Sequence, residues 1–194
     1  MKTVFFDIDT QIDFMYPAGA LYVPGAERIL PHIERLNRYA AAHGIVVVST
    51  MCAHSENDEE FRTWPAHCVV GTVGQQKPCS TRLEGAQQII LEKQKLDLFS
   101  NPSLPGLLQK LGADQYVVYG VVTEYCVKCA AMGLLATGKP VSLVTDAIET
   151  LKKAEGDAMI RAFTAKGGRL TTVSEVCGQS AQNYSPAAGS PARG

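Results

Sequence analysis

The stretch from Val117 to Leu135 reads V-V-Y-G-V-V-T-E-Y-C-V-K-C-A-A-M-G-L-L and predicts a strand that leads directly into a helix. Its β-branched start is typical of a buried strand, and its Ala-, Met- and Leu-rich end favours a helix. Cys126 falls at the expected first turn of that helix, where unpaired backbone N–H groups favour a thiolate. Buried structural cysteines are common, so the position alone makes Cys126 a candidate nucleophile and no more.

Outward from this stretch, short apolar runs alternate with segments of helical spacing. Strands are expected at 2–8, 45–51, 88–92, 115–120, 141–145 and 169–173, and helices at 27–43, 104–111, 126–137 and 152–166. Such alternation is typical of a parallel sheet that is covered by helices on both faces. The predicted fold class is therefore α/β, a three-layer Rossmann-like fold with about six mainly parallel strands.

Length and composition predict one domain. The chain has 194 residues, of which 46% are hydrophobic, enough for a full core over residues 1–177. Residues 178–194 are rich in Ala, Ser, Gly and Pro and are expected to form a flexible tail. The net charge of −1 argues against a nucleic-acid surface or a polybasic membrane patch. No apolar run approaches the roughly 20 residues of a membrane span. With six scattered cysteines expected as reduced thiols, we predict a cytoplasmic protein.

The segment between Cys52 and Glu84 breaks the pattern. It is long, polar and rich in Gly and Pro, and it contains the only tryptophan, Trp64. A long irregular segment in a compact domain is usually functional, so we expect part of a site here.

Several chemically active residues follow predicted strands. Asp9 follows the first strand, Lys93 the third and Cys126 the fourth. Because the carboxyl ends of parallel strands meet at one edge of a sheet, these side chains are expected to converge. A carboxylate can take a thiol proton, an ammonium can stabilise the pair, and the thiolate can attack a carbonyl carbon. Asp9 could instead cap a loop or a helix start, and Lys93 could instead be a solvated surface charge.

The motifs around these residues resemble those of the isochorismatase-like cysteine hydrolase superfamily, which includes nicotinamidases. The resemblance covers residues 1–175. Its segments are D-T-Q-I-D-F from Asp9, K-Q-K-L-D-L-F from Lys93, G-V-V-T-E-Y-C-V up to Val127, and W-P-A-H-C-V-V-G-T from Trp64. The last segment is similar to one typical of the nicotinamidase branch.

This resemblance implies a catalytic triad of Asp9, Lys93 and Cys126, with Lys93 preferred over Lys95 from its spacing to Phe99. It also implies a cis peptide bond at Val121–Val122 and an oxyanion hole made by the N–H groups of Val122 and Cys126. The implied chemistry is hydrolysis of a small carboxamide through a thioester. Members of the superfamily are commonly homo-oligomers, and we expect the same here.

The resemblance also bears on the substrate and on a metal. Phe14 and Trp64 match the positions that sandwich an aromatic ring in nicotinamidases. Nicotinamidases bind a divalent metal through Asp-x-His and further histidines. Here the corresponding residues are Cys52, His54, Glu60 and His67. Thiolate, imidazole and carboxylate can hold zinc, and iron or manganese are the alternatives. A metal-free site, as in other branches, stays open.

Three alternatives remain at this stage. The first is an isochorismatase-family hydrolase that acts on another amide or a ureido compound. The second is a redox protein, because Cys126 and Cys129 form a Cys-x-x-Cys at a helix start, although Cys129 reads better as a core residue. The third is a non-catalytic binding protein on the same fold, which a complete triad argues against.

Overall fold

A computed structural model describes residues 1–83 and 85–178. It contains a six-stranded sheet in the order β3-β2-β1-β4-β5-β6. Every pairing is parallel. The strands are β1 (Thr3–Ile8), β2 (Val46–Cys52), β3 (Gln88–Lys93), β4 (Gln115–Gly120), β5 (Val141–Ile148) and β6 (Arg169–Thr171). The predicted α/β fold with a six-stranded sheet is confirmed, and the sheet is parallel throughout.

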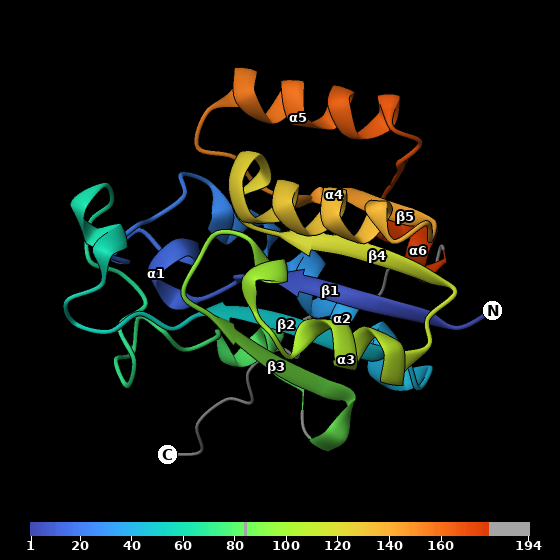
Figure 1. Cartoon of the computed structure of the whole chain (residues 1–194), viewed down its shortest axis with the longest axis horizontal. Coiled ribbons are helices and arrows are strands. Elements are labelled where there is room, and N and C mark those ends of the chain that lie inside the picture. The colour runs from blue at the N-terminus through green and yellow to red at the C-terminus, as the bar shows by residue number, and fades with distance from the viewer. Residues whose placement is uncertain (84, 179–194) are drawn as a thin grey trace, which may run out of the picture.

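Helices cover both faces of this sheet (Figure 1). The core on one face includes α3 (Leu104–Leu111), α4 (Lys128–Ala136) and α5 (Lys153–Ala165). The core on the other face includes α1 (Ile12–Met15), α2 (Leu30–Ala42) and α6 (Val173–Cys177). Alternate residues of β1 enter the two cores, with Phe6 and Ile8 on the first face and Phe5 on the second. A strand that is buried on both faces needs the continuous apolar run seen at the start of the sequence.

Several predicted boundaries differ from the structure, and three of the differences are informative. The predicted helix at 27–43 begins as a 3₁₀ turn, Ala26–Ile29, before α2. The strand predicted at 141–145 continues to Ile148. Val173, predicted to end the last strand, instead begins α6. The reason is a capping box, in which the Thr172 side chain accepts from the Glu175 N–H while the Glu175 carboxylate accepts from the Thr172 N–H.

Among its described residues, the long segment between β2 and β3 forms short 3₁₀ turns, Glu59–Arg62, Cys79–Thr81 and Gly85–Gln87, and no strand of the sheet. One isolated bridge joins His54 to Val69. We call residues 53–87 the long loop. Side-chain contacts and backbone hydrogen bonds to the segment after β1, described below, both hold it.

The strand order reverses between β1 and β4, since the chain builds outward from β1 to β3 and then returns to the other side of β1. In open α/β sheets this switch point creates a crevice at the carboxyl ends of the strands. Asp9 follows β1 and Cys126 follows β4, so both flank the crevice. Within the described residues, no helix is long and apolar enough to cross a membrane. The predicted tail lies outside the described residues from position 179 onward.

Candidate active site

Asp9, Lys93 and Cys126 meet at the switch point. Lys93 Nζ lies 2.7 Å from Asp9 Oδ2 and 3.5 Å from Cys126 Sγ. All three residues are buried. Thr50 of β2 donates to Asp9 Oδ1 at 2.6 Å, and the Asp9 N–H bonds to the Thr50 carbonyl at 3.2 Å. The structure therefore brings the three predicted side chains together at the ends of three strands.

The charges of Asp9 and Lys93 support each other. Burial raises the pKa of the Asp9 carboxyl, but the Lys93 ammonium and hydrogen bonds from Lys93, Thr50 and Cys126 bring it below its ordinary value. Burial lowers the pKa of Lys93, whereas the Asp9 carboxylate and the neighbouring cysteines raise it well above its ordinary value. The resting site thus holds a carboxylate that can accept a proton and an ammonium that can stabilise an anion.

Lys93, not Lys95, supplies this ammonium. Lys93 is the last residue of β3 and pairs in register with Cys52, so its side chain lies beside the crevice. Lys95 is exposed, and its carbonyl oxygen accepts a hydrogen bond from Lys93 Nζ at 3.1 Å. The two lysines thus have different environments, in the way that the motif spacing predicts.

Cys126 lies in a π-helical turn, Thr123–Val127, that precedes α4. The sequence predicts that Cys126 lies in the first turn of an α-helix. That turn is instead π-helical, and the α-helix begins at Lys128. Glu124 anchors the turn, because its carboxylate accepts from the N–H groups of Leu151 and Lys152 and from the Thr150 hydroxyl. A single wide turn of this kind is common at functional sites.

The peptide bond between Val121 and Val122 is cis, as the resemblance implies. The neighbouring amides are fixed, since Val121 N–H donates to Ile8 O at 2.9 Å and Thr123 N–H to Glu149 O at 2.9 Å. Val121, Val122 and Cys126 all line the same pocket. This arrangement positions the backbone beside the nucleophile where an oxyanion hole is expected.

One sequence expectation about Cys126 is wrong. A helix start was expected to lower the pKa of its thiol, but the pKa is raised well above its usual value. A hydrogen bond with Cys52 contributes most and burial comes next, while the Lys93 ammonium opposes both. The raised pKa favours the protonated thiol of Cys126.

Cys52 is a second thiol in direct contact with the triad. Its sulfur lies 3.3 Å from Lys93 Nζ and 3.7 Å from Asp9 Oδ2. Its backbone is clamped by the side chain of Gln11, which accepts from Cys52 N–H at 2.7 Å and donates to Cys52 O at 2.8 Å. Cys52 thus lies between the triad and the histidines of the long loop.

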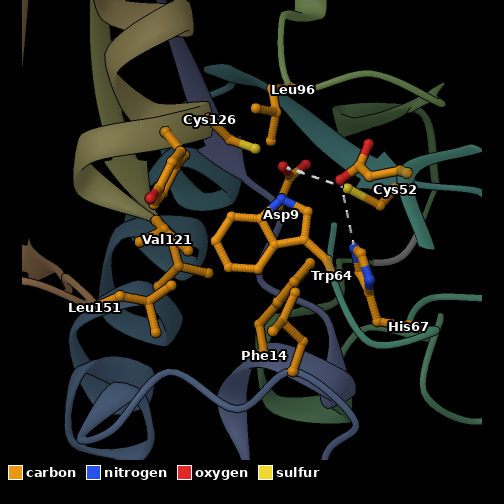
Figure 2. Close-up of a pocket in the computed structure, with 13 residues that line it drawn as sticks. Asp9, Phe14, Cys52, Trp64, His67, Leu96, Val121, Cys126 and Leu151 are labelled. Atoms are coloured by element: carbon orange, nitrogen blue, oxygen red, sulfur yellow. Dashed lines mark hydrogen bonds and ion pairs between the residues drawn. The ribbon is translucent and has the colours of Figure 1, made fainter. Parts of the chain in front are cut away.

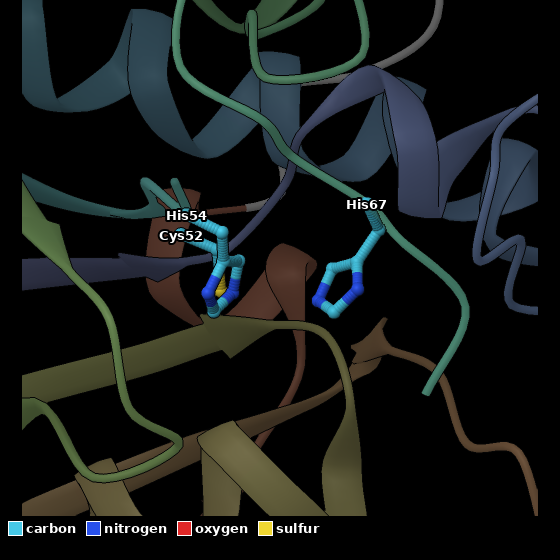
Figure 3. Close-up of side chains that lie close together, drawn as sticks. All are labelled: Cys52, His54 and His67. Atoms are coloured by element: carbon cyan, nitrogen blue, oxygen red, sulfur yellow. The ribbon is translucent and has the colours of Figure 1, made fainter. Parts of the chain in front are cut away.

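Cys52, His54 and His67 form a compact group, with their possible ligand atoms all within 4.8 Å of one another (Figure 3). His54 Nδ1 lies 3.0 Å from Asp58 Oδ2, and His67 Nδ1 lies 2.8 Å from Pro65 O. Among the described residues, His54 Nε2 is a buried polar atom without a hydrogen-bond partner. A ligating histidine typically uses one nitrogen for the metal and bonds the other to a carboxylate or carbonyl. The residues therefore fit a zinc-type ion.

Glu60 lies beside this group but is not part of it. Its Oε1 is 3.9 Å from His67 Nε2, and its N–H is held by Asp58 Oδ1 at 2.9 Å. Of the four predicted ligands, the structure brings three together and leaves Glu60 on the adjoining pocket wall.

A pocket with mainly apolar walls lies in front of Cys126. Phe14 and Trp64 line it, as predicted. Figure 2 shows Cys126 and Val121 on one side of Asp9, and Cys52 and His67 on the other. Sequence reasoning missed further lining residues, namely Leu21, Leu96, Tyr125 and Leu151. The Trp64 ring packs edge-on against Tyr125, with centroids 5.4 Å apart.

Two polar residues of the D-T-Q-I-D-F motif were also missed as site residues. Gln11 fixes Cys52, as described above. Asp13 accepts from Cys68 N–H at 2.7 Å and from Ala20 N–H at 2.9 Å, which fixes the loop immediately after His67. The motif contained both residues, but nothing in its spacing indicated which distant backbone they would hold.

Comparison with known proteins agrees with this geometry. A nicotinamidase of Acinetobacter baylyi is 26% identical over 175 residues, which cover 74% of this chain and 79% of that protein. A probable inactive nicotinamidase of Arabidopsis thaliana is 24% identical over 156 residues, covering 75% and 80%. The crystal structure of the pyrazinamidase of Pyrococcus horikoshii in complex with zinc has a TM-score of 0.82 at 27% identity, covering 89% of this chain and 99% of that one.

The family model of the isochorismatase domain matches residues 3–175. That range contains the whole sheet, all three triad positions and the long loop. The parallel sheet, the residues at its switch point and this match agree with one another, and the chain belongs to the isochorismatase family.

Proposed function

We propose that this protein is a cysteine hydrolase that cleaves the C–N bond of a small carboxamide, in the manner of a nicotinamidase. The observation that carries the proposal is the contact of Lys93 Nζ with both Asp9 Oδ2 and Cys126 Sγ at the base of an apolar pocket. The similarity to a nicotinamidase and to a pyrazinamidase supports an amide substrate. One relative is named as a probable inactive nicotinamidase, so the proposal of activity rests on the residues of this chain.

The mechanism follows from the resting charges. Asp9 takes the proton of the Cys126 thiol, and the thiolate attacks the carboxamide carbon, while Lys93 stabilises the separated charge. The N–H groups of Val122 and Cys126 hold the resulting oxyanion, a contribution of about 2.7–4 kcal/mol per donor in well-studied enzymes. Asp9 returns the proton to the leaving ammonia, and a thioester on Cys126 remains. Water, activated by the same carboxylate, releases the carboxylic acid.

The pocket walls favour a flat aromatic amide. Phe14, Trp64 and Tyr125 contribute aromatic rings, against which a flat aromatic ring can pack. Nicotinamide is the first candidate substrate. An aliphatic amide would leave these apolar walls incompletely covered.

We also propose that Cys52, His54 and His67 hold a zinc-type divalent ion at the far side of the pocket. The thiolate of Cys52 favours zinc over harder ions such as magnesium or manganese. When bound, the ion would supply a Lewis-acidic contact for a ring nitrogen of the substrate. The residues around it orient the ligands, Asp58 for His54 and the Pro65 carbonyl for His67.

The alternative of a ureido substrate uses the same triad and differs only in the leaving group. The redox alternative has less support, because Cys126 contacts Asp9, Lys93 and Cys52, which are neighbours that a hydrolytic nucleophile can use. A homo-oligomeric state and a cytoplasmic location stay predictions from the sequence.

The test is ammonia release from nicotinamide, pyrazinamide, benzamide and ureido compounds by the purified full chain, with Cys126→Ala as the control. Release from an aromatic amide that depends on Cys126 would support the proposal. Release from a ureido compound alone would favour the alternative. Equal release by the Cys126→Ala variant would contradict the mechanism.

A further inference from the structure

The long loop carries Trp64 and His67 to the pocket, yet it adds no strand to the sheet. Its last part returns beneath the turn that follows β1. There, Ile12 N–H donates to Gln76 O at 2.8 Å and Asp13 N–H to Gly74 O at 3.0 Å. The Gln11 side chain donates to Gln75 O at 2.8 Å. The end of the loop is therefore paired with the segment that directly follows the base, Asp9.

This pairing is close. A Cβ added to Gly74 would overlap the carboxylate of Asp13, so only glycine fits there. The carboxylate of Asp13 is itself held in place by the N–H groups of Ala20 and Cys68. A small shift of residues 74–77 would therefore be transmitted to the chain around Cys68, next to His67.

Beneath this pairing lies a buried ion pair that the proposed mechanism does not use. Lys77 Nζ lies 2.7 Å from Asp7 Oδ2, and the two side chains are 2% and 0% exposed. Lys77 Nζ also donates to the hydroxyl of Thr10, which in turn donates to Asp7 Oδ1 at 2.7 Å. Asn37 and Ser49 donate to Asp7 Oδ2, each at 3.2 Å. Asp7 is thus fixed to β2 and α2, and Lys77 brings the loop to it.

An ion pair this deeply buried is weak evidence for stability, because both charges lose their hydration. The pair does fix the register of the loop against β1. If the loop shifted by one residue, the Lys77 ammonium would be buried without its carboxylate partner. Among the described residues of the long loop, Lys77 alone donates hydrogen bonds to both Asp7 and Thr10.

We propose that Lys77 is a positioning residue for substrate binding: its ion pair with Asp7 fixes the register of the long loop on the catalytic turn and so holds Trp64 and His67 at the pocket. Only the expected change in KM rests on the proposed function. The attachment of the loop by Lys77 does not depend on it. Asp9 has independent support from Thr50 and Lys93, so the effect falls on binding more than on the chemical step.

The test variant is the double change Asp7→Asn with Lys77→Met, which removes both charges and leaves neither buried alone. Trp64 is the only tryptophan, so its fluorescence reports on the loop. We expect acrylamide to quench Trp64 several-fold more efficiently in this variant. We also expect KM for the amide substrate to rise about tenfold while kcat stays within about threefold. Unchanged quenching and unchanged KM in a folded double variant would overturn the proposal.

Two controls separate positioning from general stability. Asp157→Asn with Lys153→Met makes the same chemical change at an exposed ion pair of α5 and should alter neither readout. Val48→Ala weakens the core on the opposite face of the sheet and should lower the melting temperature without changing Trp64 quenching. If Val48→Ala increased quenching as much as the double variant does, the effect would be general destabilisation and the proposal would be wrong.

A third measurement does not depend on catalysis or on the double variant. Thr10→Val keeps both charges and removes the hydroxyl that joins Lys77 to the catalytic turn. Site-resolved amide exchange should then be faster at Ile12 and Asp13, whose N–H groups donate to loop carbonyls, than in the wild type. Unchanged exchange at both amides would contradict the proposal, whether or not the enzyme hydrolyses amides.

Discussion

The two halves of the site are held by different parts of the molecule. Asp9 directly follows β1, Lys93 is the last residue of β3 and Cys126 lies in the turn after β4, so their positions depend on the ladders of one parallel sheet. Trp64 and His67 belong to the long loop, which is held by side-chain contacts from Gln11, Asp13 and Lys77 and by backbone hydrogen bonds from Ile12 and Asp13. The proposed reacting groups therefore depend on the sheet, and the proposed recognition groups depend on a loop, the kind of segment that varies most.

This difference predicts two kinds of variant. Changes at strand ends should lower kcat, because in the proposed mechanism those side chains touch the reacting atoms. Changes in the loop or its attachment should raise KM and leave kcat nearly unchanged. The variants below test this division between effects on kcat and effects on KM.

The largest effect is expected for Cys126→Ala, which removes the nucleophile. Turnover should fall by at least about 10⁴-fold, with circular dichroism unchanged because alanine fits the buried position. Cys129→Ala is the matched control, since Cys129 lies one turn further on and should retain activity. Equal losses in both variants would point to the Cys-x-x-Cys pair and against the triad.

Asp9→Asn should lower kcat by about 10²- to 10⁴-fold, because the thiol loses its proton acceptor. It also leaves the Lys93 ammonium buried without its partner, and breaking such a pair costs about 3–5 kcal/mol of unfolding free energy. Urea unfolding should therefore be measured beside the kinetics. Wild-type kcat in a folded Asp9→Asn protein would exclude Asp9 as the base.

Trp64→Leu should act through the loop half of the site. KM for nicotinamide should rise about tenfold with kcat within about threefold, since the indole lines the pocket and packs against Tyr125 but has no part in the proposed proton transfer or nucleophilic attack. Steady-state kinetics measures both values. A fall in kcat as large as that of Asp9→Asn would break the division between the two halves.

Cys52→Ala should have its main effect on metal content. Loss of a ligand should weaken zinc binding by more than the roughly 10- to 100-fold that loss of an outer partner costs. Elemental analysis after dialysis against zinc measures this, and cobalt loading of the wild type should show a thiolate-to-metal charge-transfer band that the variant lacks. Equal zinc content in the two proteins would exclude Cys52 as a ligand.

The sequence predicts the strand half of the site well and the loop half less well. Residues at strand ends converge for a topological reason, and the family motifs then select Asp9, Lys93 and Cys126 among the candidates at that edge. The partners of the loop could not, because Gln11 meets Cys52 across 41 positions and Lys77 meets Asp7 across 70. No local pattern encodes contacts of that separation.

The chemical state of Cys126 was also beyond the sequence. Unpaired backbone N–H groups near the thiol favour a lower pKa, whereas the hydrogen bond with Cys52 and burial raise it. The motif indicates which residue is the candidate nucleophile. The protonation of the Cys126 thiol depends on neighbours from other strands.

The most direct test of the account is to quench the enzyme with acid during turnover of an aromatic amide and to measure the intact mass and peptide map. We predict a mass increase equal to the acyl group, located on Cys126 and absent from Cys126→Ala. The same adduct on Cys52, or undiminished turnover by Cys126→Ala, would contradict the assignment of the nucleophile.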